Sequence, residues 1–281
     1  MKKYLYLTVL CIFLAASAGS EGSYAYKKVL RVSDARVISF EEMIGELRKV
    51  DMVFVGEEHG NVRDHQAELD IVTSLRAKVA RMAIGMEMFR ADSQKTLDAW
   101  TKGSLDQGLF IQAYYNNWRM PWPNYRDILL FARDRSVPII GLNVPDQISE
   151  KVASKGFGSL SREELAKLPP GISCDIDRSY MDFIRQAYAA HGKGEDSFVH
   201  FCEAQMVWDK AMAWRLIEYL KKNPGKEVVV IAGVGHSWKR GIPEQIRRVS
   251  RYTFKVILPE VPGKTMSGSV TTGDADYILL R

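Results

Sequence analysis

Two apolar runs, one near each end of this 281-residue chain, are each followed directly by the pattern Gly-x-x-His. DMVFV at 51–55 precedes Gly56-Glu57-Glu58-His59, and EVVVIA at 227–232 precedes Gly233-Val234-Gly235-His236. Apolar runs of this kind are typical of strands that are buried on both faces of a parallel sheet. Each histidine then follows the carboxyl end of a strand, the edge at which open α/β sheets bind ligands. Because the chain has only five histidines, we expect its working site at this edge.

Strand-like and helix-like segments alternate along most of the chain, which indicates an α/β fold with a parallel sheet and crossover helices. Between residues 145 and 222 the strand pattern disappears, and Pro169-Pro170-Gly171 separates an upstream helical pair from helices at 176–190 and 196–222. We therefore expect a single domain over residues 26–281 with a helical insertion at about 145–222. The other expected elements are strands at 52–56, 82–89, 138–142, 227–233, 253–260 and 276–280, and helices at 61–80, 92–102, 125–135 and 243–250.

Residues 1–25 have the organisation of a secretory signal peptide. Two lysines precede an apolar run at 4–16, and a stretch of small residues follows. The run is short for a membrane span, so we expect cleavage after Ala25; cleavage after Ala18 and a retained anchor are the alternatives. Cys11 lacks the preceding small residues that lipoprotein processing needs. We expect a secreted protein of the periplasm or cell envelope, without a lipobox.

Charge and cysteine content narrow the class of protein further. A net charge of +5 is moderate for this length and does not favour a nucleic-acid partner. Outside the signal segment only Cys174 and Cys202 remain, which is too few for a disulfide scaffold. They are expected to form one bridge or to remain as two buried free thiols.

The first histidine motif contains two carboxylates, Glu57 and Glu58, next to His59. An imidazole and a carboxylate in one tight turn suit a metal ion, a general acid–base pair, or a carboxylate that fixes the histidine tautomer. Because successive extended residues point in opposite directions, we expect only one of the glutamates to face the site. The alternative is a polar loop whose charges are solvated.

Glu87 lies among Met86, Met88 and Phe89 near the end of an expected strand. A buried carboxylate needs a partner or a bound cation. We expect it to enter the same site, and a buried ion pair with Arg119 or Arg63 is the alternative.

Two polar residues of the long helix at 196–222, Gln205 and Asp209, stand one turn apart in an apolar stretch. They are expected either to close over the strand ends or to belong to the solvated side of the helix with Glu218. The choice between the two stays open at this point.

Further side chains could line the same cleft. His65 and His191 lie near its expected borders, whereas His200 is expected at the surface or in an interface. The segment around Tyr114, Tyr115 and Tyr125 is dense in aromatic residues and suits either a loop packed on the core or a planar ligand. A basic stretch beginning at Lys239 and Arg240 is expected to be a solvated helix face or to meet carboxylates or phosphates.

The order of these motifs resembles one family. G-E-E-H, then E-M-F at 87–89, then A-Q-M-V-W-D-K-A-M-A at 204–213, then G-V-G-H are similar to the ChaN-like haem-binding proteins, in the superfamily of the Tiki metalloproteases and erythromycin esterases. The resemblance covers about residues 38–260. It implies a three-layer α/β/α fold with a mostly parallel central sheet, and a secreted or envelope protein of iron uptake in which two subunits enclose a pair of stacked haems.

In that family a tyrosine ligates the haem iron, and a histidine and a lysine of the partner subunit hold the propionates. The resemblance does not identify the tyrosine here, so Tyr114, Tyr115, Tyr125 and Tyr180 are all candidates. His191, Lys239 and Arg240 are the expected propionate partners. An outer-membrane uptake system is the expected further partner.

The Tiki-like members suggest a competing function, a divalent-metal-dependent hydrolase. His59, Glu87 and His236, with Asp209, are then the expected ligands of zinc, manganese or cobalt, and Glu57 or Glu58 would activate a bound water. A binding module without catalysis is the third possibility. Of these, we expect a haem-binding protein of the cell envelope, with the hydrolase as the alternative.

Overall fold

The computed structural model of the chain describes residues 24–176, 178–188, 195–262, 265 and 268–281. Most of the expected signal segment and His191 therefore lie outside the described residues. Within them, no helix is both long and apolar enough to span a membrane. The strands are β1 (Lys28–Arg31), β2 (Arg36–Ser39), β3 (Met52–Glu57), β4 (Met82–Arg90), β5 (Ile139–Asn143), β6 (Glu227–Gly233), β7 (Phe254–Pro259) and β8 (Tyr277–Leu279).

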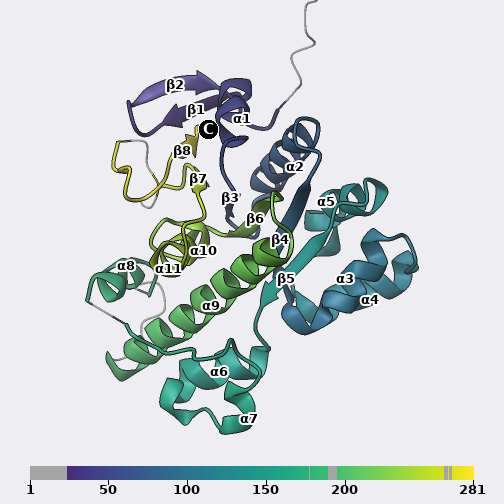
Figure 1. Cartoon of the computed structure of the whole chain (residues 1–281). Coiled ribbons are helices and arrows are strands. Elements are labelled where there is room, and N and C mark those ends of the chain that lie inside the picture. Colours follow the sequence, from purple (N-terminus) through teal and green to yellow (C-terminus); the bar gives the residue numbers. More distant parts are fainter. Residues whose placement is uncertain (1–23, 177, 189–194, 263–264, 266–267) are drawn as a thin grey trace, which may run out of the picture.

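All of these strands form one eight-stranded sheet of order β2-β1-β8-β7-β3-β6-β4-β5. The strands from β8 to β5 run parallel, and β1 pairs antiparallel with both β8 and β2 at one edge. The expected mostly parallel sheet is confirmed. Strand β6 lies between β3 and β4 (Figure 1), with Glu57 opposite Gly233 and Met86 opposite Ile231.

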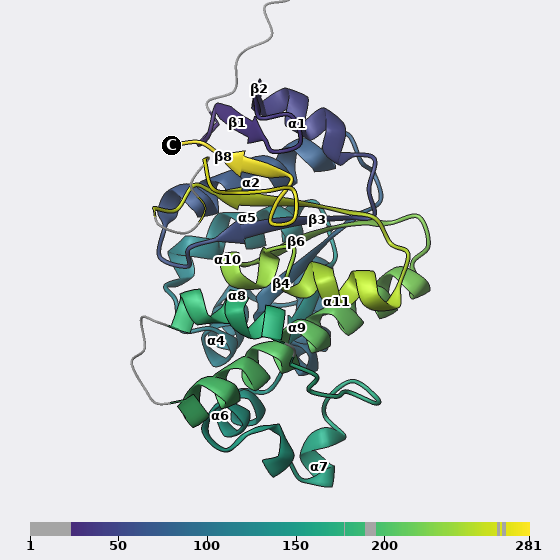
Figure 2. The ribbon, with the colours of Figure 1, turned by 90° about the vertical axis from the view of Figure 1, so that its left-hand side faces the viewer.

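Helices cover both faces of the sheet (Figure 2). Successive side chains of β3 point to opposite faces of the sheet, and both faces are apolar. Val53 and Val55 belong to one buried cluster, and Met52 and Phe54 belong to another. The first cluster is covered by α1 (Phe40–Leu47), α2 (Val62–Arg76), α3 (Gln94–Thr101), α4 (Gln107–Asn117) and α5 (Trp122–Asp134). The second is covered by α9 (Glu195–Lys222) and α11 (Ile242–Val249), and the short α10 (Val234–Ser237) directly follows β6. The expected three layers are present.

The helical segment between β5 and β6 is organised around α9. The second half of α9 packs on the sheet through Met212 and Leu216. Its first half carries Val207 toward α6 (Asp146–Lys155) and Met206 toward α8 (Arg178–Tyr188). A short α7 (Arg162–Leu165) lies between α6 and α8 in the chain. One long helix therefore connects the inserted helices to the sheet.

Four elements differ from the sequence-based expectation. Strands β1 and β2 and helix α1 were not predicted, because the strands have four residues each and only Ile38 of β2 is buried. The aromatic segment before Trp118, expected as a possible loop, is mostly the helix α4. Its Asp106 accepts hydrogen bonds from the amides of Gly108 and Leu109, a cap typical of a helix start.

Candidate functional site

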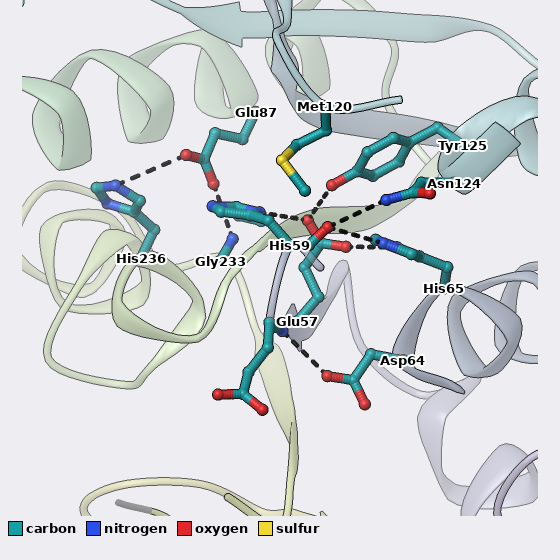
Figure 3. Close-up of polar contacts among 12 residues, drawn as sticks. Glu57, His59, Asp64, His65, Glu87, Met120, Asn124, Tyr125, Gly233 and His236 are labelled. Carbon is teal, nitrogen blue, oxygen red and sulfur yellow. Dashed lines mark hydrogen bonds and ion pairs between the residues drawn. The ribbon is translucent and has the colours of Figure 1, made fainter. Parts of the chain in front are cut away.

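Because β6 lies between β3 and β4, the two Gly-x-x-His motifs and Glu87 lie side by side. Strand β3 ends at Glu57, two residues before His59, and β6 ends at Gly233, so that His236 lies in α10. Glu87 lies near the end of β4. Figure 3 shows the side chains of Glu87 and His59 beside Gly233, with His236 on the far side of Glu87. The two Gly-x-x-His motifs and Glu87 thus form one polar site at the expected edge.

Glu87 is the central carboxylate of this site and is 5% exposed. Its Oε2 accepts a hydrogen bond from the amide of Gly233 at 2.8 Å, and its Oε1 lies 3.8 Å from Nε2 of His236. Gly233 also allows His59 to approach, since a Cβ at Gly233 would be 3.0 Å from Cε1 of His59. Glu87 therefore lies between the two imidazoles.

The alternative partners that the sequence suggested for Glu87 were wrong. Arg63 donates to the carbonyl of Ala25, and Arg119 lies 3.9 Å from Glu150 at the surface. A backbone amide and an imidazole compensate the buried carboxylate instead of an arginine.

His236 is bound by Asp209 of α9. Its Nδ1 lies 2.7 Å from Oδ1 of Asp209, and the hydroxyl of Tyr180 donates to Oδ2 at 2.9 Å. Burial alone would lower the pKa of His236, but the charges of Glu87 and Asp209 raise it to about 9. Helix α9 thus closes over the strand ends with Asp209, as one of the two alternatives predicted, whereas Gln205 is half-buried.

His59 is bound in the same manner by Glu57, whose Oε1 lies 2.6 Å from the Nδ1. Burial opposes the charged imidazole, yet the hydrogen bond to Glu57 and the charge of Glu87 raise the pKa of His59. Its side chain is 36% exposed, so it is the more accessible of the two imidazoles. In both histidines a buried carboxylate contacts the Nδ1 atom, so the Nε2 atom is available to a ligand of the site.

Only one of the two adjacent glutamates faces this site, as expected. Glu57 is 2% exposed, and the carboxylate of Glu58 lies 3.5 Å from Arg281. The amide of Glu58 donates to Asp64, which anchors the turn.

Behind Glu57 lies a second group of polar side chains. The hydroxyl of Tyr125 donates to Oε1 of Glu57 at 2.5 Å, and Oε2 lies 2.7 Å from Nδ1 of His65. His65 also approaches Glu68, one turn further along α2, at 3.4 Å. His65 and Tyr125 were candidates from the sequence, whereas Glu68 was missed. Glu68 follows His65 by three residues on one helix, and this spacing could have indicated that the two side chains lie together.

The structure separates the four tyrosine candidates. Tyr114, Tyr125 and Tyr180 are buried, and their hydroxyls donate to Met120, Glu57 and Asp209, respectively. Tyr115 is 51% exposed, and its hydroxyl accepts a hydrogen bond from the amide of Trp122 at 3.1 Å.

The candidate propionate partners Lys239 and Arg240 have acidic neighbours of their own. Lys239 lies 3.1 Å from Asp276, and Arg240 lies 3.7 Å from Asp274. Neither contact belongs to the site around Glu87.

The two cysteines are free thiols. Cys202 is buried and Cys174 is half-buried. Burial raises the pKa of each thiol. The expectation of two free thiols is therefore the one that matches the structure.

Among the described residues, the three side chains whose potential ligand atoms all lie within 4.8 Å of one another are Glu57, His65 and Glu68. This group differs from the predicted ligand set of His59, Glu87, His236 and Asp209, which stays a prediction.

An α/β/α fold with a histidine–carboxylate site at the carboxyl edge of its sheet defines the class of this protein. The chain belongs to the family described as haem-binding uptake, Tiki superfamily, ChaN, whose model matches residues 43–246. It is similar to the solved structure of cofacial haem binding to ChaN of Campylobacter jejuni, with a TM-score of 0.70, 21% identity, and coverage of 89% of this chain and 95% of that chain. The suspected family is confirmed.

Two further proteins are similar over most of this chain. An erythromycin esterase mutant in its open conformation has a TM-score of 0.50 at 13% identity, covering 81% of this chain and 77% of that chain. Protein RETICULATA-RELATED 5, chloroplastic, from Arabidopsis thaliana is 24% identical over 256 residues, which are 81% of this chain. The chain spans 35% of the length of that curated relative. The structural likenesses support the fold.

Proposed function

We propose that this protein binds haem in the cell envelope and serves haem or iron uptake, with haem held between two copies of the chain. The observation that carries the proposal is the family match over residues 43–246 together with an exposed tyrosine. The neighbour from Campylobacter jejuni is described with cofacial haem, which supports the same ligand here. An outer-membrane uptake system is the proposed source of the haem.

Tyr115 is the proposed ligand of the haem iron. It lies on an exposed face of α4 with Leu109, and the two side chains are 51% and 55% exposed. Its hydroxyl oxygen accepts a hydrogen bond from the amide of Trp122. A tyrosinate oxygen is an established ligand of haem iron. Arg119, whose side chain is 90% exposed, supplies a nearby cation for a propionate.

The dimer follows from the shape of the ligand. A haem bound on α4 would bury one of the two flat faces of the porphyrin and leave the other face in contact with water. A second copy with its own haem covers that face, since burial of apolar surface is the main driving force for association. The exposed Leu109 and Tyr115 then belong to the interface.

Haemin titration of the purified wild type and of the Tyr115→Phe variant tests both the binding of haem and the assigned iron ligand. The wild type is expected to shift the Soret band and to double its sedimenting mass, whereas Tyr115→Phe loses at least tenfold in affinity because the iron ligand is gone. Tyr114→Phe is the matched control, because it removes a neighbouring hydroxyl that is already committed to Met120. Unchanged affinity of Tyr115→Phe contradicts the assigned ligand, and an unshifted wild-type spectrum contradicts haem binding itself.

The paired imidazoles favour a second candidate, hydrolysis at the site around Glu87. In His59 and His236 the Nδ1 atoms are held by carboxylates, so Nε2 is available for a water or a metal ion. Zinc, manganese or cobalt held there would polarise a carbonyl group. Peptide or ester turnover that disappears in His236→Ala supports this candidate; turnover that persists in that variant excludes it.

A further inference from the structure

A buried group of ligand-type side chains lies behind the site, between β3, α2 and α5. Glu57, His65 and Glu68 are 2%, 7% and 1% exposed, and their potential ligand atoms lie within 4.8 Å of one another. Groups of acidic residues are common at protein surfaces, but this one is enclosed. Two carboxylates in one enclosed space repel each other unless a positive charge lies between them or one of them is protonated.

The hydrogen bonds of this group are incomplete. Glu57 Oε2 and Glu68 Oε1 are buried and have no hydrogen-bond partner. Glu57 Oε2 does lie 2.7 Å from Nδ1 of His65, at the distance of an ion pair but without hydrogen-bond alignment. Buried carboxylate oxygens are otherwise almost always satisfied, so both oxygens indicate a missing partner.

The tautomer of His65 points to the same conclusion. Its Nε2 lies 3.1 Å from the carbonyl oxygen of His59, which can only accept, so the proton of a neutral imidazole lies on Nε2. The lone pair of Nδ1 then faces Glu57 and Glu68, at 2.7 and 3.4 Å. A histidine whose second nitrogen donates to a backbone carbonyl is typical of metal ligands.

We propose that Glu57, His65 and Glu68 bind a divalent transition-metal ion, Zn²⁺ or Mn²⁺, in a buried site beneath the candidate cleft. Two carboxylates and one imidazole are a common donor set for these ions, and three protein ligands leave a position for a water.

The buried ion would also be coupled to the cleft. Glu57 would contact it through Oε2, while Oε1 of the same carboxylate holds His59 and Tyr125. The site is independent of Tyr115 and of the proposed haem. It is also distinct from a metal bound by Glu87, which lies on a different strand.

The test uses the full chain, stripped of metal with a chelator, and then titrated with Zn²⁺, Mn²⁺, Mg²⁺ or Ca²⁺ without haem. Metal content after desalting is expected to reach one equivalent for Zn²⁺ or Mn²⁺. Mg²⁺ and Ca²⁺ are expected to bind poorly because they prefer all-oxygen ligands. At a hundredfold excess over Kd the bound ion should raise Tm by roughly 5 °C.

Glu68→Gln is expected to lose the equivalent of metal, and Glu87→Gln is the matched control that retains it. Since Glu68→Gln changes a fully buried carboxyl group, His65→Gln is measured beside it as a second ligand variant, and circular dichroism checks the folding of both. Loss of metal in Glu87→Gln but not in a folded Glu68→Gln or His65→Gln would place the ion in the cleft and overturn the proposal. A wild type that takes up neither Zn²⁺ nor Mn²⁺ overturns it as well, whatever the haemin titration gives.

Discussion

Replacing Asp209 with alanine is expected to lower the free energy of unfolding by about 3–5 kcal/mol. The variant takes from the buried His236 the carboxylate that holds its Nδ1, with Glu87 left 3.8 Å from its Nε2, and it removes the acceptor of the Tyr180 hydroxyl. Urea denaturation followed by circular dichroism measures the loss. Asp175→Ala is the matched control, because that exposed aspartate pairs with Lys210 at the surface and its loss should leave the midpoint unchanged.

The deficit of Asp209→Ala should depend on pH. The pKa of His236 is raised from 6.5 to about 9 in the folded state, so the stability contributed by its charge is complete below pH 6.5 and is lost as the pH rises through 9. The difference between wild type and variant is therefore expected to shrink between pH 6 and pH 10 in the presence of a chelator. A difference that stays constant over this range would refute the ion pair as its cause.

Gly241→Ala is expected to destabilise the protein by about 3 kcal/mol. A Cβ at Gly241 would lie 2.5 Å from the carbonyl oxygen of His236 and 2.8 Å from that of Gly235, both backbone atoms that cannot rotate away. The turn that carries His236 must then shift. Thermal unfolding measures the stability, and the affinity of any ligand of the cleft should fall with it.

Gly235→Ala provides the control for that substitution. A Cβ at Gly235 meets no atom within 4 Å. The change is expected to leave Tm unaltered within a degree or two. If Gly235→Ala were as damaging as Gly241→Ala, the steric argument would fail.

The paired strands and their motifs could be predicted because they are simple in pattern. Strands β3 and β6 are buried on both faces, so continuous apolar runs identified them. The position of β6 between β3 and β4 is not written in any local run, and it was not predicted from the sequence. The role of Asp209 stayed open for a related reason, because a polar residue on a helix looks the same whether it meets water or a buried histidine.

The tyrosines show where sequence reasoning ends. Tyr114 and Tyr115 are neighbours in one aromatic segment, and nothing local distinguishes them. In the helix α4 they point in different directions, so one is fully buried and the other is half exposed. Glu68 is a comparable case, since a glutamate in the middle of a helix is normally solvated and its burial depends on the packing of α2 against β3 and α5.

The position of β6 also has a consequence for the way in which the chain acquires its structure. Strands β3 and β4 are made early, yet the strand that joins them begins only at Glu227. A growing or truncated chain that stops before this point lacks β6 and β7, so both edges of β3 and one edge of β4 are unpaired and the site is absent. Such contacts between distant parts of a chain are slow to form, and exposed edges attract other chains. The protein thus depends on its last fifth for solubility during folding as well as for the histidine that completes its site.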